Sequence, residues 1–257
     1  MSDLLERYRV GVRDAWRSAD LVAVLAEHGL VLLDGVTDSA DLVRLAREIA
    51  TVVAHRDSDP AGVTTIADLG GERVRSGFAG FSARALHPHT DRSGISTPPA
   101  LLMMSCGQPA VSGGECVVID GKAVYDELAE SEPDAIRALS APRSALFGGA
   151  AGHLGSIFAN AADGRVTVRL RLDDLAYFSP DVSRWLPELR AAIDRHAITF
   201  RLGTGTGYIL HNHRWLHGRR AFLGQRVMYR VNGNPLPHLG IPSGFHPTRQ
   251  LTPRTAA

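Results

Sequence analysis

The stretch GTGYILHNHRWLHGRRAF, residues 205–222, concentrates three histidines within seven positions. His211, His213 and His217 share parity, so on a straight strand their imidazoles would lie on one face of a sheet. Imidazole is the commonest metal-binding side chain, which makes each of the three a candidate ligand. The spacing does not choose among them. The stretch therefore predicts a strand that carries a metal-binding histidine and leaves its identity open.

A second polar stretch, HPHTDRSG at residues 87–94, offers a further pair of ligands. His89 and Asp91 are two positions apart, so in an extended segment both side chains project from one face, with Cα atoms roughly 6.6 Å apart. An imidazole nitrogen and a carboxylate oxygen could then converge on one ion. Taken alone, the stretch is more typical of a surface turn, because it also contains proline, serine and glycine. Whether this stretch is a metal-binding pair or a surface turn therefore depends on whether a third ligand exists elsewhere in the chain.

The charge of the chain argues against large anionic partners. Its 257 residues include 28 basic and 27 acidic side chains, and Lys122 is the only lysine. A protein that binds nucleic acid or an anionic membrane surface would show a marked positive excess. We therefore expect neither nucleic acid nor membrane as a partner, and we expect any anion to be bound by one or two placed arginines.

The cysteines and the N-terminal residues indicate a cytoplasmic protein. Cys106 and Cys116 are too few for a disulfide framework and form no CxxC motif. Residues 1–16 alternate charged and apolar side chains, unlike a signal peptide. No window approaches the 18 or so uninterrupted apolar residues of a membrane-spanning helix.

The apolar pattern predicts an α+β chain with helices early and a many-stranded sheet or barrel afterwards. Helices are expected over residues 38–53, with Thr37 or Asp38 as cap, and near residues 121–139 and 186–196. Extended runs are expected over residues 29–36, 63–69, 99–106, 115–120, 165–172, 197–202, 207–217 and 225–233. In the run 165–172, Arg169 and Arg171 fall on the face predicted to be solvated. Residues 248–257 have little to bury and are expected to form a flexible tail.

Five short motifs occur together in the order of a known family. They are HTD at 89–91, PP at 98–99, SGGEC at 112–116, the stretch at 205–222 and QRVMYR at 225–230. Over residues 87–233 this pattern resembles the iron(II)/2-oxoglutarate dioxygenases of the taurine dioxygenase and clavaminate synthase-like superfamily. The resemblance implies a double-stranded β-helix, or jelly-roll barrel, with flanking helices, in a single domain spanning residues 1–257.

The resemblance also implies which histidine is the third ligand. His217, in the motif LHGR, would join His89 and Asp91 in binding iron(II). Two imidazoles and one carboxylate on one face of an octahedral ion leave three positions open, which suits a non-haem iron oxygenase and not a closed zinc site. The cosubstrates 2-oxoglutarate and O2 would take these positions, and the reaction would yield succinate and CO2 while a substrate C–H bond is oxidised.

Two arginines follow the third ligand closely. Arg226 and Arg230 are four apart on a predicted strand, so both can face the interior, and a guanidinium can bind a carboxylate through two parallel hydrogen bonds. By resemblance, Arg226 binds the distal carboxylate of 2-oxoglutarate and Arg230 contacts the substrate.

The chain departs from the family pattern at three positions. Cys116 stands where a threonine or serine usually helps to hold the distal carboxylate, and a thiol is a weaker donor than a hydroxyl. Either the thiol is a tolerated replacement or another hydroxyl, such as that of Ser112 or Thr206, takes over. Thr206 and His211 also replace two aspartates of the pattern, whereas Asn212 is retained.

The residues around the motifs bear on the reaction and the substrate. Asp91 is retained where related halogenases carry a small residue, so hydroxylation, desaturation or cyclisation is favoured over halogenation. Arg84, Arg92 and Phe81 flank the HTD motif and are candidate substrate contacts, although exposed charges and core packing would explain them equally well. The resemblance favours an amino acid, free or carrier-bound, or another small polar intermediate of specialised metabolism. It leaves open whether the protein forms a homo-oligomer.

Two other classes of protein remain as alternatives. A zinc-dependent hydrolase could use the same three ligands without 2-oxoglutarate or O2, but the sequence has no HExxH motif. A catalytically silent jelly-roll binding protein would explain the departures from the family pattern.

Overall fold

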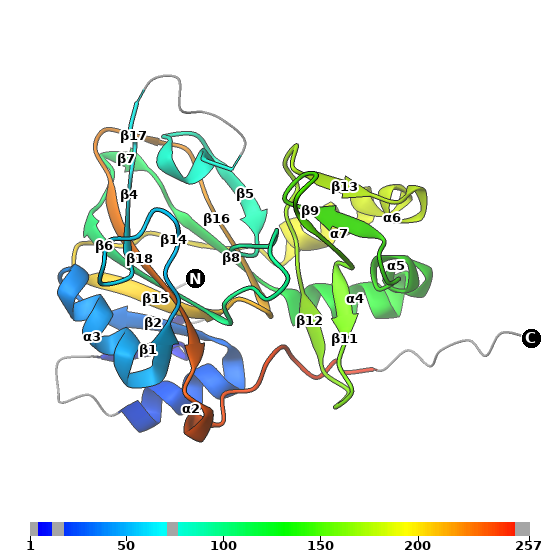
Figure 1. The fold of residues 1–257 in the computed structure, drawn as a ribbon, viewed down its shortest axis with the longest axis horizontal. Helices are drawn as coiled ribbons and strands as arrows, with labels where there is room; N and C mark the ends of the chain where they lie inside the picture. Colours follow the sequence, from blue (N-terminus) through cyan, green and yellow to red (C-terminus); the bar gives the residue numbers. More distant parts are fainter. Residues whose placement is uncertain (1–4, 12–17, 71–76, 250–257) are drawn as a thin grey trace, which may run out of the picture.

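The computed structural model describes residues 5–11, 18–70 and 77–249 (Figure 1). The tail predicted for residues 248–257 falls almost entirely outside them. The described part mixes six α-helices with many short strands, which confirms the predicted mixture of the two.

A seven-stranded sheet forms the body of the molecule. It runs in the order β1-β2-β15-β6-β18-β3, with β4 also paired to β18. Only the β1–β2 pair is parallel among these pairings. The strands are β1 Arg9–Gly11, β2 Leu30–Asp34, β3 Ala50–Val52, β4 Val63–Ala67, β6 Leu101–Gln108, β15 Thr206–His211 and β18 Val227–Pro235.

A smaller, antiparallel sheet faces the large one. It has the order β14-β8-β16-β5, with bounds Ile198–Phe200, Cys116–Asp120, Trp215–Arg219 and Leu86–His89. One buried apolar cluster joins the two sheets and includes Leu32, Leu102, Met104, Tyr208 and Met228 of the large sheet and Cys116, Val118, Phe200 and Trp215 of the small one. The two sheets therefore pack face to face through this core.

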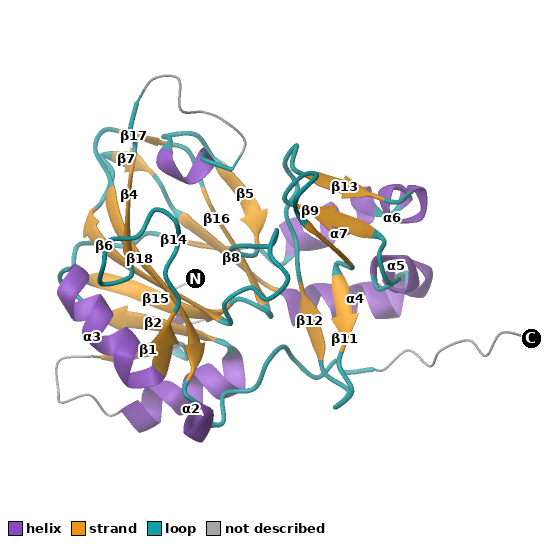
Figure 2. Ribbon diagram, viewed as in Figure 1, coloured by secondary structure: helices purple, strands orange, loops and turns teal. Residues whose placement is uncertain are grey.

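Two helices cover the other face of the large sheet (Figures 1 and 2). They are α2 Ser18–His28 and α3 Ser39–Ile49. Alternate residues of β2 show the two faces, because Leu30 and Leu32 belong to the core between the sheets whereas Val31 and Leu33 pack against the helices. The fully apolar run of β2 thus reflects burial on both sides.

A side-chain cap starts helix α3, and strand pairing of the residues that follow ends it. The carboxylate of Asp38 accepts the backbone N–H of Asp41 at 2.8 Å, so Asp38 is the cap, one of the two residues that the sequence offered. The predicted extension to residue 53 is wrong, because Ala50–Val52 pair with β18 as strand β3.

A lobe of small strands and four helices packs beside the small sheet around its own apolar cluster (Figure 2). Its elements are α4 Gly121–Ser131, α5 Pro133–Leu139, α6 Pro180–Arg184, α7 Leu186–Arg195, β9 Ala145–Phe147, β10 His153–Gly155, β11 Phe158–Asn160, β12 Val166–Val168 and β13 Ala176–Phe178. The short elements β7 Ser112–Gly113, β17 Phe222–Leu223, η1 Ala79–Phe81 and η2 Pro237–Leu239 complete the description. The single helix predicted near residues 121–139 is in fact two, because Pro133 cannot donate the hydrogen bond that would continue α4.

Two extended runs are shorter than predicted. Residues 212–214 form a turn, so residues 207–217 are two strands, β15 and β16, and not one. Of residues 165–172 only β12 is a strand. Arg169 does not lie on a solvated strand face, because its guanidinium donates to the carbonyl oxygens of Ser93 at 2.8 Å and Ser96 at 2.9 Å.

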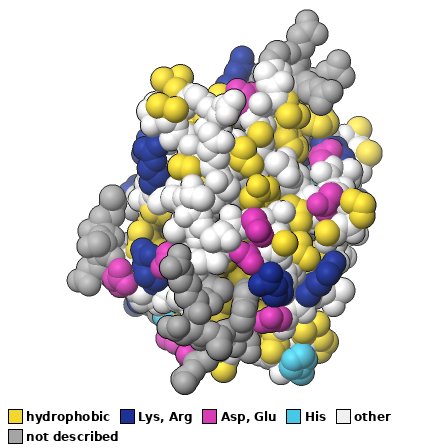
Figure 3. All heavy atoms as spheres, turned by 90° about the vertical axis from the view of Figure 1, so that its left-hand side faces the viewer, with side chains coloured by type: hydrophobic (Ala, Val, Ile, Leu, Met, Phe, Trp, Pro, Cys, Tyr) yellow, Lys and Arg dark blue, Asp and Glu magenta, His cyan; other side chains and the backbone are white. Residues whose placement is uncertain are grey.

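The surface carries charges of both signs. Figure 3 shows basic and acidic side chains interspersed on one face, in keeping with the near balance of charge in the sequence. Within the described ranges, no helix has the length and apolarity needed to cross a membrane. The cytoplasmic location stays a prediction.

The close approach of β15 and β6 can be tested at Gly207. A methyl group there would collide with the backbone carbonyl of Met104 on the neighbouring strand. We expect Gly207→Ala to lower the free energy of unfolding by about 2 kcal/mol or more. Gly203→Ala is the control, because a Cβ at Gly203 meets nothing within 4 Å and should change stability by less than about 0.5 kcal/mol. Urea denaturation of the two variants measures the difference, and equal stabilities would contradict the packing.

Candidate active site

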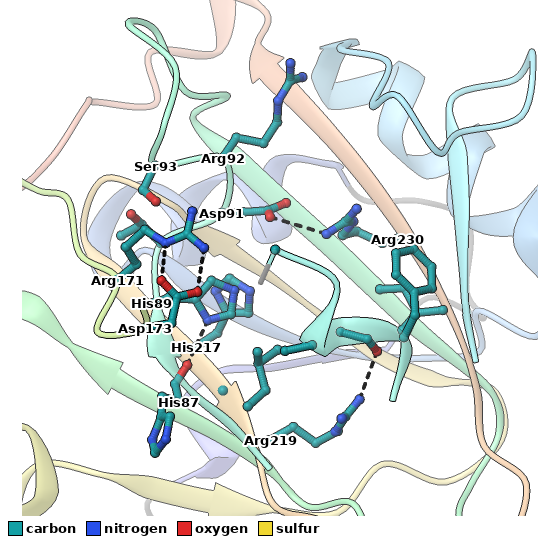
Figure 4. Close-up of a pocket in the computed structure, with 18 of the residues that line it drawn as sticks. His87, His89, Asp91, Arg92, Ser93, Arg171, Asp173, His217, Arg219 and Arg230 are labelled. Carbon is teal, nitrogen blue, oxygen red and sulfur yellow. Dashed lines mark hydrogen bonds and ion pairs between the residues drawn. The ribbon is translucent and has the colours of Figure 1, made fainter. Parts of the chain in front are cut away.

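Two histidines that are distant in sequence meet across a strand pair. His89 ends β5, His217 lies in the middle of β16, and the two are register partners in the antiparallel ladder. Their ring centroids are 4.3 Å apart, and the rings lie side by side in Figure 4. The predicted partners His89 and His217 are therefore neighbours in the fold. The turn at residues 212–214 contains His213 and separates His217 from His211.

The segment that carries Asp91 is held by a buried asparagine. Asn212, in the turn after β15, accepts the backbone N–H of Asp91 at 2.7 Å. Its amide donates to the carbonyl oxygens of Asp91 at 3.0 Å and Pro99 at 2.9 Å. Asn212 thus fastens the HTD motif to the loop that precedes β16.

The carboxylate of Asp91 has two partners from β18. Asn232 donates to one oxygen at 2.9 Å, and the Arg230 guanidinium lies 3.3 Å from the other (Figure 4). Burial by itself would raise the pKa of this carboxyl, but Arg230 and the neighbouring groups hold the pKa well below its usual range. Asp91 is therefore ionised.

Both imidazoles are neutral. Burial lowers the pKa of His89 and lowers that of His217 well below the usual histidine value. The Nδ1 of His89 lies 2.9 Å from the carbonyl oxygen of His87 and must carry a proton to use it, which leaves the lone pair of Nε2 free. The Nδ1 of His217 is buried and finds no hydrogen-bond partner of good geometry in the described part of the chain.

This donor set fits a divalent iron ion in its chemistry. Neutral imidazoles and an ionised carboxylate are the protonation states that metal binding requires. The three groups are not drawn together, however, and no cluster of three His, Cys, Asp or Glu side chains close enough to hold a metal is found within residues 5–11, 18–70 and 77–249. The reason lies in the hydrogen bonds of Asp91, which direct its carboxylate to Arg230 and Asn232.

A cavity of about 480 Å³ opens beside the two histidines. Eight of the nine residues predicted for the site line it: His89, Asp91, His217, Arg226, Cys116, Arg230, Arg92 and Phe81. The ninth, Arg84, is exposed and lies outside the lining. Arg92 adopts a left-handed backbone conformation, with φ of 54°, and donates to the carbonyl oxygen of Ala54 at 3.1 Å.

Arg226 is a buried cation that lines the cavity. It is 6% exposed, and no ion pair to it is found among the residues that the structure describes. Its side chain packs closely over Gly114, where an added Cβ would lie 3.3 Å from Nε, and its guanidinium lies 5.7 Å from the centre of the Phe222 ring. A buried guanidinium is costly unless an anion neutralises it, so this end of the cavity is suited to a carboxylate ligand.

A second buried arginine, Arg219, was not predicted. It donates to the carbonyl oxygens of Gly80 at 3.2 Å and of Ser82 and Arg84 at 2.5 Å each. Burial, and then the neighbouring Arg226, lower its pKa to about 10. Arg219 thus fastens the loop that carries Phe81 to the wall of the cavity. The LHGR motif contained it, but nothing in the spacing indicated its partners.

The predicted role of Arg171 is wrong, and one histidine was missed. Arg171 lines the cavity and forms a two-pronged ion pair with Asp173, at 2.7 and 2.5 Å (Figure 4). His55, which was not among the predicted site residues, also lines the cavity. Both reach the site from loops, whose course periodicity does not predict.

Thr206 and His211, the other two departures from the family pattern, do not line the cavity. Ser112 and Thr206 do not line the cavity, and the Thr206 hydroxyl donates to the carbonyl oxygen of Gly203 at 2.8 Å. His211 is buried outside the lining, and burial, then His213, lower its pKa to about 3. The phenol that does line the cavity is that of Tyr208, which the sequence analysis did not single out.

Comparison with solved structures supports the fold. The crystal structure of asparagine oxygenase (AsnO) matches with a TM-score of 0.72 and 16% identity over 94% of this chain and 100% of that chain. The oxygenase OrfP, solved with Fe, succinate and (3S)-hydroxy-L-Arg, matches with a TM-score of 0.65 and 14% identity over 84% and 80%. PvcB from Pseudomonas aeruginosa matches with a TM-score of 0.63 and 18% identity over 85% and 80%. At such identities the likeness shows the fold alone.

Sequence comparison places the chain in a family. No curated protein matches it in sequence. The family model described as "Taurine catabolism dioxygenase TauD, TfdA family" matches residues 9–232, most of the chain, and confirms the predicted resemblance. The chain therefore belongs to the TauD/TfdA dioxygenase family and is an iron(II)- and 2-oxoglutarate-dependent oxygenase.

Proposed function

We propose that this oxygenase hydroxylates an unactivated C–H bond of a free amino acid or a similarly small polar metabolite. Iron(II) would be held by His89, Asp91 and His217. The observation that carries the proposal is the pairing of His89 with His217 across adjacent strands at the mouth of a charged cavity.

Each residue of the site has a proposed task. The bound iron supplies the oxidising chemistry that 2-oxoglutarate and O2 support. Asp91 contributes the negative charge of the ligand set, and Asn212 keeps its backbone in position. Arg226 binds the distal carboxylate of 2-oxoglutarate, and Arg230 contacts the substrate.

The charges along the cavity support a zwitterionic substrate. The guanidinium groups of Arg92 and Arg230 line it together with the Arg171–Asp173 pair, so groups of both signs face the space beside His89. An amino acid presents the same two signs at short separation. The structural relatives AsnO and OrfP were solved with hydroxylated asparagine and hydroxylated arginine, which points to the same class.

The proposal also covers the barrel topology and the number of domains. We infer that the two facing sheets form the double-stranded β-helix, or jelly-roll barrel, of the family, within one domain. Attachment of the substrate to a carrier and assembly into a homo-oligomer stay predictions.

The two alternative classes are less well supported. A zinc hydrolase would have no use for Arg226, a buried guanidinium that lines the same cavity and has no ion-pair partner among the described residues. A catalytically silent binding protein is disfavoured because the chain belongs to a family of oxygenases.

The proposal can be tested by substrate screening. The purified protein would be supplied with iron(II), 2-oxoglutarate and O2, and succinate release would be measured with each of the common amino acids. We expect at least one of them to raise succinate release well above the substrate-free rate. If none does, although the anaerobic protein shows the visible absorption band of an iron–2-oxoglutarate chelate, the oxygenase acts on another class of substrate.

Asp91 is expected to be essential for turnover. Asp91→Asn preserves the shape of the side chain and its contact with Arg230 but removes the charge that iron requires. We expect succinate release to fall by at least about 100-fold. Asp120→Asn is the control, because Asp120 also pairs with an arginine, Arg214 at 2.7 Å, but lies outside the cavity. Comparable losses in both variants, at equal folding, would contradict the role of Asp91.

The hydrogen bonds that Asn212 makes around Asp91 should affect metal binding as well as stability, and a matched variant can distinguish the two effects. Asn212→Ala removes three hydrogen bonds around Asp91, so we expect about 2–4 kcal/mol less stability and roughly 10- to 100-fold weaker metal binding. Asn234→Ala removes one bond, to the N–H of Ala100, without touching Asp91. It should cost about 1 kcal/mol and leave metal affinity unchanged. Chelator competition gives the affinities, and equal affinities would overturn this role of Asn212.

A further inference from the structure

Tyr208 is a buried phenol that faces the cavity. Its side chain is 2% exposed, it lines the cavity, and its ring packs edge-on against Phe200 with centroids 6.1 Å apart. No hydrogen bond from its hydroxyl to another described residue is found. The hydroxyl is therefore available to donate a hydrogen bond to a ligand in the cavity.

The packing of the two sheets places this phenol close to Cys116. Tyr208 pairs with Met104, and Met104 pairs with Arg230, so the three lie in one cross-strand row on the cavity side of the large sheet. From the opposite sheet, Cys116 pairs with Phe200, the ring that Tyr208 contacts. Arg226 lines the same cavity, and after burial Cys116 and then Arg226 have the largest effects on the pKa of Tyr208, ahead of Arg230.

The cavity carries excess positive charge around Arg226. The guanidinium groups of Arg219 and Arg226 both lie close to the Phe222 ring, at 4.8 and 5.7 Å from its centre. Arg219 is bonded to backbone carbonyls, and no carboxylate pairs with either guanidinium in the described ranges. Arg226 is therefore the guanidinium of the two that is better able to bind an entering carboxylate.

We propose that the phenol of Tyr208, with the thiol of Cys116, completes the binding of the distal carboxylate of 2-oxoglutarate on Arg226. Tyr208 would supply the hydroxyl that the family usually places at position 116. Ser112 and Thr206, the other candidates in the sequence, lie outside the cavity lining. The inference rests on the proposed use of Arg226.

The protonation states agree with this geometry. Burial raises the pKa of Tyr208 well above its ordinary value, and burial raises the pKa of the Cys116 thiol to about 11. Both groups are therefore neutral donors near pH 7. Neither adds a negative charge that would repel an incoming carboxylate, and the phenol is the better donor of the two.

The test is a binding measurement with two keto acids. Tyr208→Phe removes only the hydroxyl. Titration of the anaerobic iron(II) protein, followed by the visible chelate band, gives the Kd for 2-oxoglutarate and for 2-oxopentanoate, which has the same chain without the distal carboxylate. We expect Tyr208→Phe to weaken 2-oxoglutarate binding about 10- to 100-fold and to change 2-oxopentanoate binding less than about twofold.

Two further variants isolate the hydroxyl. Adding Cys116→Ser to Tyr208→Phe restores a hydroxyl at the usual family position and should recover several-fold of the lost affinity. Tyr125→Phe is the matched control, because Tyr125 is equally buried, at 3% exposed, but belongs to the cluster of the helical lobe. It should leave both Kd values unchanged.

The outcomes separate the inference from the proposed function. If the wild type binds neither keto acid, the proposed function fails. If the wild type prefers 2-oxoglutarate and Tyr208→Phe keeps that preference in full, Tyr208 has no role, while the proposed function stands. Should Tyr208→Phe fail to fold, as judged by circular dichroism, Tyr208→Leu takes its place. Loss of affinity for both keto acids alike would assign Tyr208 a structural role and overturn the inference.

Discussion

The pairing of β16 with β5 is the interaction on which the site depends. A shift of one residue in this register would move His217 to the opposite face of the sheet, away from His89. Gly218 allows the strands to approach, because a Cβ there would lie 2.6 Å from the carbonyl oxygen of Leu86. The ladder is irregular just beyond, between His217 and Arg219, and both of these side chains line the cavity. One short strand therefore positions an imidazole and a guanidinium together.

The arginines that line the cavity differ in whether the protein supplies their hydrogen-bond or ion-pair partners. A buried guanidinium needs partners, and Arg219 and Arg230 have them in the protein, as backbone carbonyls and as Asp91. Arg226 has no carboxylate partner among the described residues, which is why we propose that a ligand neutralises it. A dicarboxylate cosubstrate would gain affinity from such an arrangement, because the free-energy cost of burying the cation would be met on folding and not on binding.

The sequence predicted the local elements better than the paths between them, and the assignment of His89, Asp91 and His217 as metal ligands stays a prediction. The alternation of Val166, Val168 and Leu170 identified three residues that are all buried, yet only the first two belong to a strand. Burial follows from side-chain pattern, whereas strand pairing depends on a distant partner. The same limit explains Tyr208, whose parity placed it on one face of β15 but said nothing of the Cys116 strand opposite. The motif spacing could bring His89 to His217 only through the resemblance to a family.

The position of Arg230 makes the effect of its substitution on activity difficult to assign to one cause. Its guanidinium lies 3.3 Å from Asp91, and its Nε is buried without a partner in the described part of the chain. Since a guanidinium has five N–H donors, one group can serve both a metal-binding carboxylate and a substrate carboxylate. Replacing Arg230 would then disturb the charge of Asp91 and the substrate at once. Among the described residues, no hydrogen bond or ion pair joins Arg226 or Tyr208 to Asp91, so their replacement should report on the cosubstrate with less interference from the proposed ligands of the metal.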